Sequence, residues 1–232
     1  MRGTFLNTAT VAGGALVGLA IGRRVPPAYE AIVLGATGLV VIGMGLKMFL
    51  QARDVVVVAV AVAVGGILGV ALGFDTGLHA FSEWARGLFG GEAGRFNEAV
   101  ITTSVLYCVG PMTLLGCLQD GLEGKIELLA IKSTMDGITA VFFAAALGPG
   151  VLVTAAVILV FQGALTLMAR RLRGLASDEA LISEMTGAGG VMLMALGLGL
   201  LDLKKLPVAN FLPAIAAAPA CVWLQRRFKH VG

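Results

Sequence analysis

Eight long apolar stretches dominate this sequence. A helix needs about 20 apolar residues to cross the roughly 30 Å hydrocarbon core of a bilayer. The stretches that reach this length, each bounded by charged or turn residues, are residues 4–22, 29–50, 55–73, 98–118, 127–147, 151–169, 181–201 and 207–224. A lone strand cannot satisfy its backbone in lipid, so each stretch is predicted to be a helix. We therefore predict an all-α, polytopic transmembrane bundle of about eight spans, forming a single integral-membrane domain over residues 1–232.

The composition excludes most soluble functions. Hydrophobic residues make up 58% of the chain and charged residues only 13%, about half the charged share of an ordinary soluble domain. No basic tract indicates nucleic-acid binding. The three cysteines form no CxxC pair or Cys/His cluster, so we expect no metal site and no cofactor. With no HExxH or GxSxG motif, an enzyme is the weakest functional class.

A short amphipathic segment follows the third span. Over residues 76–89, apolar side chains such as Phe81 and Trp84 recur at helical spacing, with polar residues between them. This pattern predicts a helix lying at the membrane interface, anchored by Trp84. With eight spans, ten Lys and Arg residues fall on one side and six on the other. The positive-inside rule then favours a bacterial inner-membrane protein with both termini in the cytoplasm.

The first three and last three spans resemble each other. Glu30-Ala31-Ile32 and Glu179-Ala180-Leu181 each precede a glycine-rich span, and each follows a span that ends in paired arginines, Arg23-Arg24 and Arg170-Arg171. The two copies, residues 4–73 and 151–224, flank central spans over residues 98–147. Because they are five spans apart, a duplication would place them in opposite orientations, as in many secondary transporters. The alternative is that Gly/Ala/Leu-rich helices resemble one another by composition alone.

Polar and helix-breaking residues within the spans are the candidate binding site. Gly110-Pro111, after Cys108, should break the fourth span, because proline removes a backbone donor. The break would serve a ligand or gate, or be only a packing kink. Lys132 and Asp136, around Ser133, share one helical face and could pair inside the fifth span. The alternative is that both lie near the headgroups.

Three further amides lie within apolar segments. Asn7 and Asn210 stand early in the first and last spans, where an amide caps or bridges helices, and Gln162 is deep in the sixth span and needs a partner. Glu184 is interpreted as interfacial, which leaves Asp136 as the one acidic residue predicted within a span. Small residues in the first span, Gly13, Gly14 and Gly18, suggest a homodimer.

The chain resembles a bacterial membrane family labelled domain of unknown function 554, the YqgA-like proteins. The resemblance covers nearly the whole chain, with phenylalanine expected where Tyr107 stands. It is carried by Gly3-Thr4 with Asn7, Cys108-Val109-Gly110-Pro111-Met112, Gly121-Leu122, Lys132-Ser133 with Asp136-Gly137, Gln162-Gly163, Thr186 with Gly189-Gly190, and Val208-Ala209-Asn210 with Leu212-Pro213-Ala214. It implies a membrane protein for which transport has been suggested, without an established chemistry.

These features favour a secondary transporter or ion-coupled permease for a small solute or ion. In this hypothesis the substrate sits between the two repeats, near Gly110-Pro111. Asp136 binds a cation or proton, and Lys132 supplies the counter-charge. One alternative is an ion channel, which steady uncoupled conductance would reveal. Another is a non-transporting membrane sensor or assembly protein.

Overall fold

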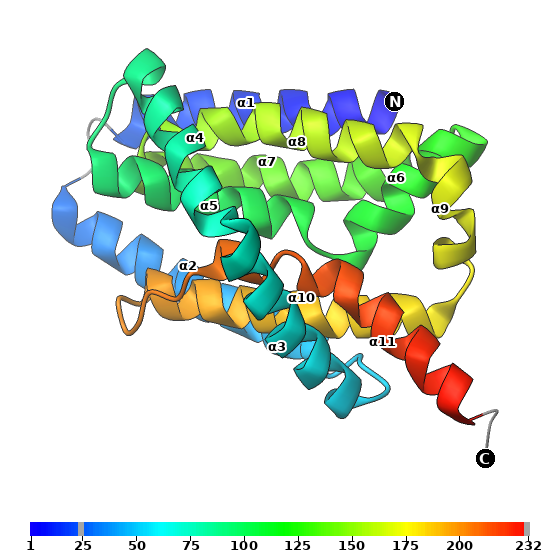
Figure 1. Cartoon of the computed structure of the whole chain (residues 1–232). Helices are drawn as coiled ribbons and strands as arrows, with labels where there is room; N and C mark the ends of the chain where they lie inside the picture. Colours follow the sequence, from blue (N-terminus) through cyan, green and yellow to red (C-terminus); the bar gives the residue numbers. More distant parts are fainter. Residues whose placement is uncertain (23–25, 230–232) are drawn as a thin grey trace. The chain divides into compact units, whose positions relative to one another are not determined.

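The computed structural model of the protein describes residues 1–22 and 26–229 (Figure 1). The regular secondary structure of these residues is entirely helical, as predicted. Arg23 and Arg24, which entered the repeat comparison, lie outside the described residues. The helices are α1 (Arg2–Gly22), α2 (Pro27–Phe49), α3 (Val55–Leu72), α4 (Phe74–Phe89), α5 (Ala93–Cys108), α6 (Pro111–Glu123), α7 (Glu127–Leu147), α8 (Gly150–Leu167), α9 (Ala169–Ala176), α10 (Glu179–Leu200), the 3-10 helix η1 (Val208–Phe211) and α11 (Ala214–Lys229).

Seven of the described helical segments are long and apolar enough to cross a membrane. They are α1, α3, α7, α8, α10, residues 31–49 of α2, and residues 208–227 around α11. The predicted fourth span is divided into α5 and α6, which meet at an angle of 61°. Together these segments confirm a membrane protein with seven to eight candidate spans.

Contacts within the chain divide it into two compact units. The first unit contains Met1–Ala36 and Leu78–Arg173, and the second contains Thr37–Gly77 and Gly174–Gly232. The first unit therefore holds α1, α5, α6, α7 and α8. The second holds most of α2 together with α3, α10, η1 and α11.

In the first unit, α1 and α7 pack in parallel with their backbones almost touching. A Cβ atom at Gly14 would lie 2.2 Å from the carbonyl oxygen of Gly137, and one at Gly18 would lie 2.2 Å from that of Val141. Small residues permit this close approach between membrane helices. Gly14 and Gly18, two of the three residues on which the homodimer prediction rested, are thus occupied within the chain. Only Gly13 has open space around its Cα.

The α5–α6 pair lies beside α8 from its first turn to its last turn. Near its start, α5 approaches the first turn of α8, where a Cβ at Gly150 would lie 2.5 Å from the carbonyl oxygen of Phe96. Near its end, α6 approaches the last turn of α8, where a Cβ at Gly121 would lie 2.3 Å from the carbonyl oxygen of Thr166. A re-entrant loop would return to the end at which it began. This course agrees with one broken span, and the eighth crossing stays a prediction.

In the second unit, two pairs of helices run antiparallel. Gly38 of α2 lies against the Gly197 end of α10, and Gly45 lies against Gly190. The N-terminus of α3 lies beside the C-terminal part of α11, where Gln225 donates to the Asp54 carboxylate at 2.8 Å. The predicted repeat pairs α2 with α10, α3 with α11 and, in the first unit, α1 with α8. The two helices of each pair are antiparallel neighbours. An inverted duplication requires opposite orientations, and the duplication itself stays a prediction.

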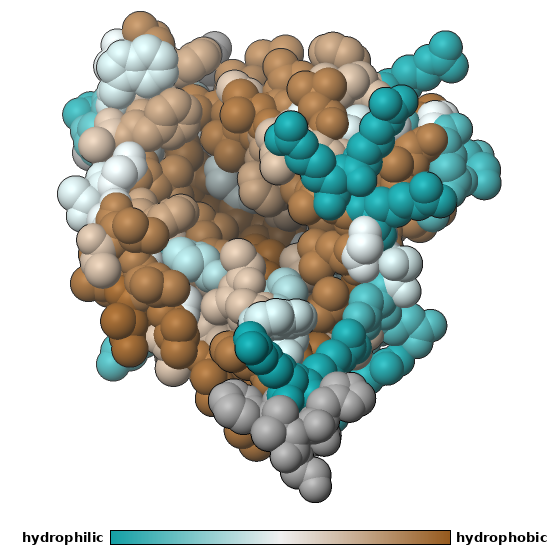
Figure 2. Space-filling model, turned by 45° about the vertical axis from the view of Figure 1, so that its right-hand side comes forward, coloured by the Kyte–Doolittle hydropathy of each residue, from teal (hydrophilic) through white to brown (hydrophobic). Residues whose placement is uncertain are grey.

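The predicted interfacial helix corresponds to α4, which begins two residues earlier than expected. Its apolar face leaves Trp84 64% exposed, while Ser82 and Ala85 are buried. Ser82 donates to the side-chain oxygen of Asn97 on α5, and Asn97 donates to Glu83. Apolar side chains cover most of the face shown in Figure 2, where the hydrophilic side chains gather mainly along its right-hand side. Such a surface suits lipid, with polar groups reserved for the boundary.

Candidate functional site

The centre of the candidate site is an ion pair inside α7. The Lys132 ammonium lies 2.6 Å and 2.9 Å from the two carboxylate oxygens of Asp136. The two residues are one helical turn apart, as the sequence predicted, and only 9% of each side chain is exposed. The pair therefore lies within the protein, packed between helices. Buried ionisable groups in spans usually mark an ion or substrate pathway.

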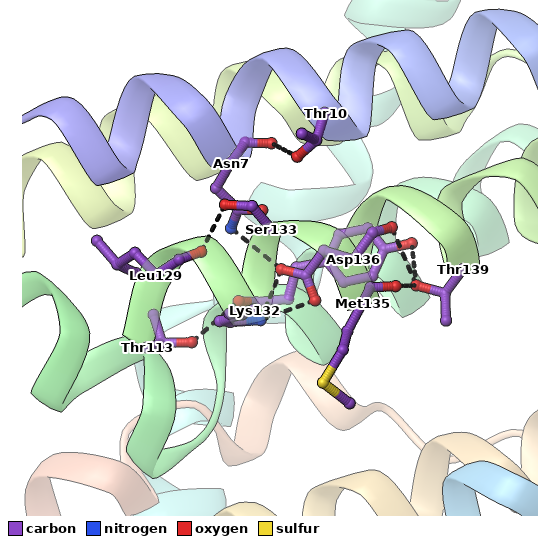
Figure 3. Close-up of polar contacts among 10 residues, drawn as sticks. Asn7, Thr10, Thr113, Leu129, Lys132, Ser133, Met135, Asp136 and Thr139 are labelled. Carbon is purple, nitrogen blue, oxygen red and sulfur yellow. Dashed lines mark hydrogen bonds and ion pairs between the residues drawn. The ribbon is translucent and has the colours of Figure 1, made fainter. Parts of the chain in front are cut away.

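Asn7 joins this pair from α1. Its side-chain N–H donates to Asp136 Oδ2 at 3.0 Å, and Asn7 itself is fully buried (Figure 3). The amide was predicted to cap or bridge helices, and the structure shows a bridge between α1 and α7. Asp136 consequently accepts hydrogen bonds from two side chains on two helices, which fixes its carboxylate at their interface.

The break in the fourth span lies beside the pair. At Gly110 the backbone has a φ of 142°, a conformation that favours glycine, and Pro111 begins α6 without needing a donor. Thr113 donates its hydroxyl proton to the carbonyl oxygen of Tyr107 at 3.2 Å, which satisfies a carbonyl near the break. The predicted break at Gly110-Pro111 is thus present as two separate helices.

Tyr107 connects the break to the ion pair, a role that was not predicted from the sequence. Its ring centroid lies 5.9 Å from the Lys132 ammonium, a cation–π distance. Its hydroxyl oxygen accepts a hydrogen bond from Thr139 at 3.2 Å, and the residue is fully buried. The signal that could have identified it is a lone tyrosine in an apolar span, three residues before a Gly-Pro break.

Several predicted residues take other roles. Ser133 donates to the carbonyl oxygen of Leu129 in its own helix at 2.6 Å, so its hydroxyl does not contact the ion pair. Cys108 is buried as a free thiol at the end of α5. Asn210 belongs to the second unit, where its side-chain oxygen accepts the Asp75 N–H at 3.0 Å.

Two further acids, Asp120 and Glu184, are buried within the protein near helix ends. Asp120, near the end of α6, accepts the Gly3 N–H at 3.0 Å and so caps the start of α1 from a neighbouring helix. Glu184, interpreted from the sequence as interfacial, is 2% exposed and accepts the N–H groups of Arg53 and Asp54. Both acids accept hydrogen bonds from backbone N–H groups at the N-terminal end of a helix, where the helix dipole favours negative charge.

Gln162 lies buried on α8 without a hydrogen-bond partner. Both its side-chain nitrogen and its oxygen are unpaired among the described residues, and the same holds for the Asn7 oxygen and the Ser104 hydroxyl. The sequence predicted that Gln162 needs a partner, and the described part of the chain does not supply one. Within that part, no group of three or more His, Cys, Asp or Glu residues could hold a metal ion.

The comparisons with known proteins agree with this architecture. A family model described as a protein of unknown function, DUF554, matches residues 2–223. The chain belongs to the DUF554 family. It is 27% identical over 236 residues to the uncharacterized membrane protein YdfK of Bacillus subtilis, covering 98% of both chains. It is 26% identical over 221 residues to the uncharacterized protein YqgA of Escherichia coli, covering 93% of this chain and 94% of that one. No solved structure matches it.

In this DUF554 protein, the site combines a positive charge, a negative charge and an amide bridge beside a broken helix. The family resemblance predicted from the sequence is confirmed, and it carries no substrate. The chemistry must be read from the residues. A carboxylate whose partners are a lysine on the same helix and an asparagine on another can change partners when a cation or proton arrives.

Proposed function

We propose that this protein is a secondary transporter or ion-coupled permease for a small solute or ion. The observation that carries the proposal is the Lys132–Asp136 pair, buried in α7, bridged to α1 by Asn7 and adjacent to the broken α5–α6 span. Substrate and ion sites of secondary transporters commonly lie at discontinuous helices deep in the membrane. We place the protein in the bacterial inner membrane, with both termini in the cytoplasm.

Stability alone is a poor reason for such a pair. Burying two charges removes their hydration, and well-packed apolar residues in the same place are often equally or more stabilising. The pair also lies in lipid-crossing segments, where ionisable residues are rare. A functional role explains the presence of two charged residues at a position where apolar residues would pack well. In that role, a cation or proton replaces Lys132 as the partner of Asp136.

The antiparallel counterparts support a transporter in particular. The pairs α1 with α8, α2 with α10 and α3 with α11 have the opposite orientations that an inverted repeat predicts. Repeats of this kind let one bundle rock against another around a fixed site. We infer that residues 4–73 and 151–224 are such repeats.

The test begins with a thermal-shift screen of inorganic ions and small metabolites on the purified protein, because a ligand that binds the folded state raises its unfolding temperature. Ligands found in this way are then followed into proteoliposomes. A transporter gives saturable uptake that depends on an ion gradient. Steady conductance without saturation in planar bilayers would instead show a channel. Failure to bind or move any of the screened compounds would contradict transport and favour a sensor or assembly role.

A further inference from the structure

Asn7 and Gln162 carry unpaired amide atoms in the first unit that the ion pair does not explain. Both residues are fully buried, and neither the Asn7 oxygen nor either polar atom of Gln162 has a hydrogen-bond partner among the described residues. Buried polar atoms are almost always satisfied, and exceptions point to a water, an ion or a function. The three unpaired atoms on these two residues indicate a binding site for a small ligand.

The two amides lie at the same level of the α1–α8 interface. Thr4 on α1 and Thr166 on α8 are joined by their hydroxyls at 3.2 Å. From this contact, Asn7 is three residues further along α1 and Gln162 is four residues back along α8. Because the helices are antiparallel, both steps lead in the same direction, by about 4.5 Å and 6 Å at 1.5 Å per residue. Asn7 and Gln162 therefore lie at similar heights on the two neighbouring helices, just beyond the two threonines.

The orientation of the Asn7 amide is fixed by its neighbour. The Asp136 carboxylate, held by Lys132, accepts hydrogen bonds and cannot donate them. The Asn7 nitrogen must therefore face Asp136, as observed at 3.0 Å, and the oxygen must point elsewhere. Flipping the amide would set two acceptors against each other. The oxygen of Asn7 is consequently a free acceptor.

The local charge restricts what can bind there. The charged groups at this level, Lys132 and Asp136, neutralise each other at 2.6 Å. About one turn away, the Asp120 carboxylate pairs with the Met1 ammonium at 2.9 Å and accepts the Gly3 N–H. A ligand with net charge would be buried in a low-dielectric interior without a counter-charge, which is strongly unfavourable. An uncharged ligand avoids this desolvation cost.

We propose that Asn7 and Gln162 bind a small, uncharged solute that both donates and accepts hydrogen bonds, a class that includes amides, ureas and polyols. The two free amide oxygens need donors from the solute, and the free Gln162 N–H groups need an acceptor. This inference rests on the proposed transport function and names its solute class. Asn7 then links the solute to the ion pair, since one end of its amide holds Asp136 and the other faces the solute. Any change of partner at Asp136 therefore reorients the Asn7 oxygen, which accepts from the solute.

The experiment measures swelling of proteoliposomes by stopped-flow light scattering in urea, acetamide and glycerol, with sodium formate as the charged comparison. The variants are Gln162→Met, which keeps the length of the side chain and removes its polar atoms, and Gln162→Asn, which keeps the amide and shortens its reach. The matched control is Thr134→Val on the exposed side of α7, where the hydroxyl bonds only to its own helix. Thermal unfolding of each variant verifies that it is folded.

We expect at least one neutral solute to enter faster than into empty liposomes. Gln162→Met should lower that protein-dependent rate at least tenfold, Gln162→Asn should lower it less, and Thr134→Val should leave it unchanged. Equal rates in folded Gln162→Met and wild type would overturn the site. Protein-dependent movement of formate or sodium without any neutral solute would overturn the solute class while the transport proposal stands. Movement of no compound at all would overturn both.

Discussion

Replacing Lys132 with methionine should destabilise the protein more than any other single change at the ion pair. The methionine keeps the apolar stem but leaves the Asp136 carboxylate buried with Asn7 as its remaining side-chain donor. Only 9% of each charged side chain is exposed, so water cannot replace the lost ammonium. Removing one partner of a buried pair typically costs about 3–5 kcal/mol. For a chain of this size, 1 kcal/mol corresponds to about 2–4 °C, which predicts a drop of roughly 6–20 °C.

The assay is the apparent unfolding temperature in detergent for a double-mutant cycle. Asp136→Asn alone should lower it less, because the amide oxygen still accepts from Asn7 and Lys132. Adding Asp136→Asn to Lys132→Met should recover most of the loss, because no buried charge then remains unpaired. Lys125→Met is the matched control, since its pair with Glu123 is exposed and such pairs contribute little. A Lys132→Met protein within about 2 °C of wild type, or additive losses in the double variant, would refute this reasoning.

Three further predictions concern packing, pH and topology. Gly14→Leu should prevent α1 from closing on α7 and lower the yield of folded protein, whereas Gly13→Leu, with open space around it, should fold as wild type in size-exclusion chromatography. Hydrogen bonds from Arg226 of α11 lower the pKa of Asp178, the N-cap of α10, from 3.8 to about 2. The ionised Asp178 carboxylate therefore stabilises the fold above about pH 4, and this stabilisation is lost as the pH falls towards 2. The advantage of wild type over Asp178→Asn in unfolding temperature should therefore shrink over that range, and a constant difference would contradict the assignment. Cysteines introduced at Glu92 and Lys125 should react with impermeant thiol reagents from opposite sides of the membrane, and labelling from one side would mean that α5–α6 is re-entrant.

Features encoded locally in the sequence were predictable. Hydropathy over about 20 residues located the spans, because lipid imposes that length on every helix. The Gly110-Pro111 break follows from the chemistry of two adjacent residues, and the Lys132–Asp136 pair follows from helical spacing of four. None of these inferences needed to know which helices are neighbours.

Features that depend on helix neighbours were predicted poorly. Asn7 reaches Asp136 across 129 positions of sequence, and Asp120 caps α1 across 117. Hydropathy does not encode the rotation of one helix against another, which decides such contacts. The burial of Glu184 was not predicted for the same reason, since it results from contacts with the N–H groups of Arg53 and Asp54 in the turn between α2 and α3. The glycines of α1 were interpreted as a dimer face because close packing looks the same in sequence, whichever helix is the partner.

The most direct test of the proposed transport mechanism is the pH dependence of solute uptake into proteoliposomes by Asp136→Asn. The substitution preserves the shape of the side chain and its bond to Asn7, so the variant should insert and fold. Because it cannot exchange a proton or cation at that position, uptake should lose its response to an imposed proton or sodium gradient. Uptake by Asp136→Asn with the gradient response and pH profile of wild type would contradict the assignment of Asp136 as the coupling group.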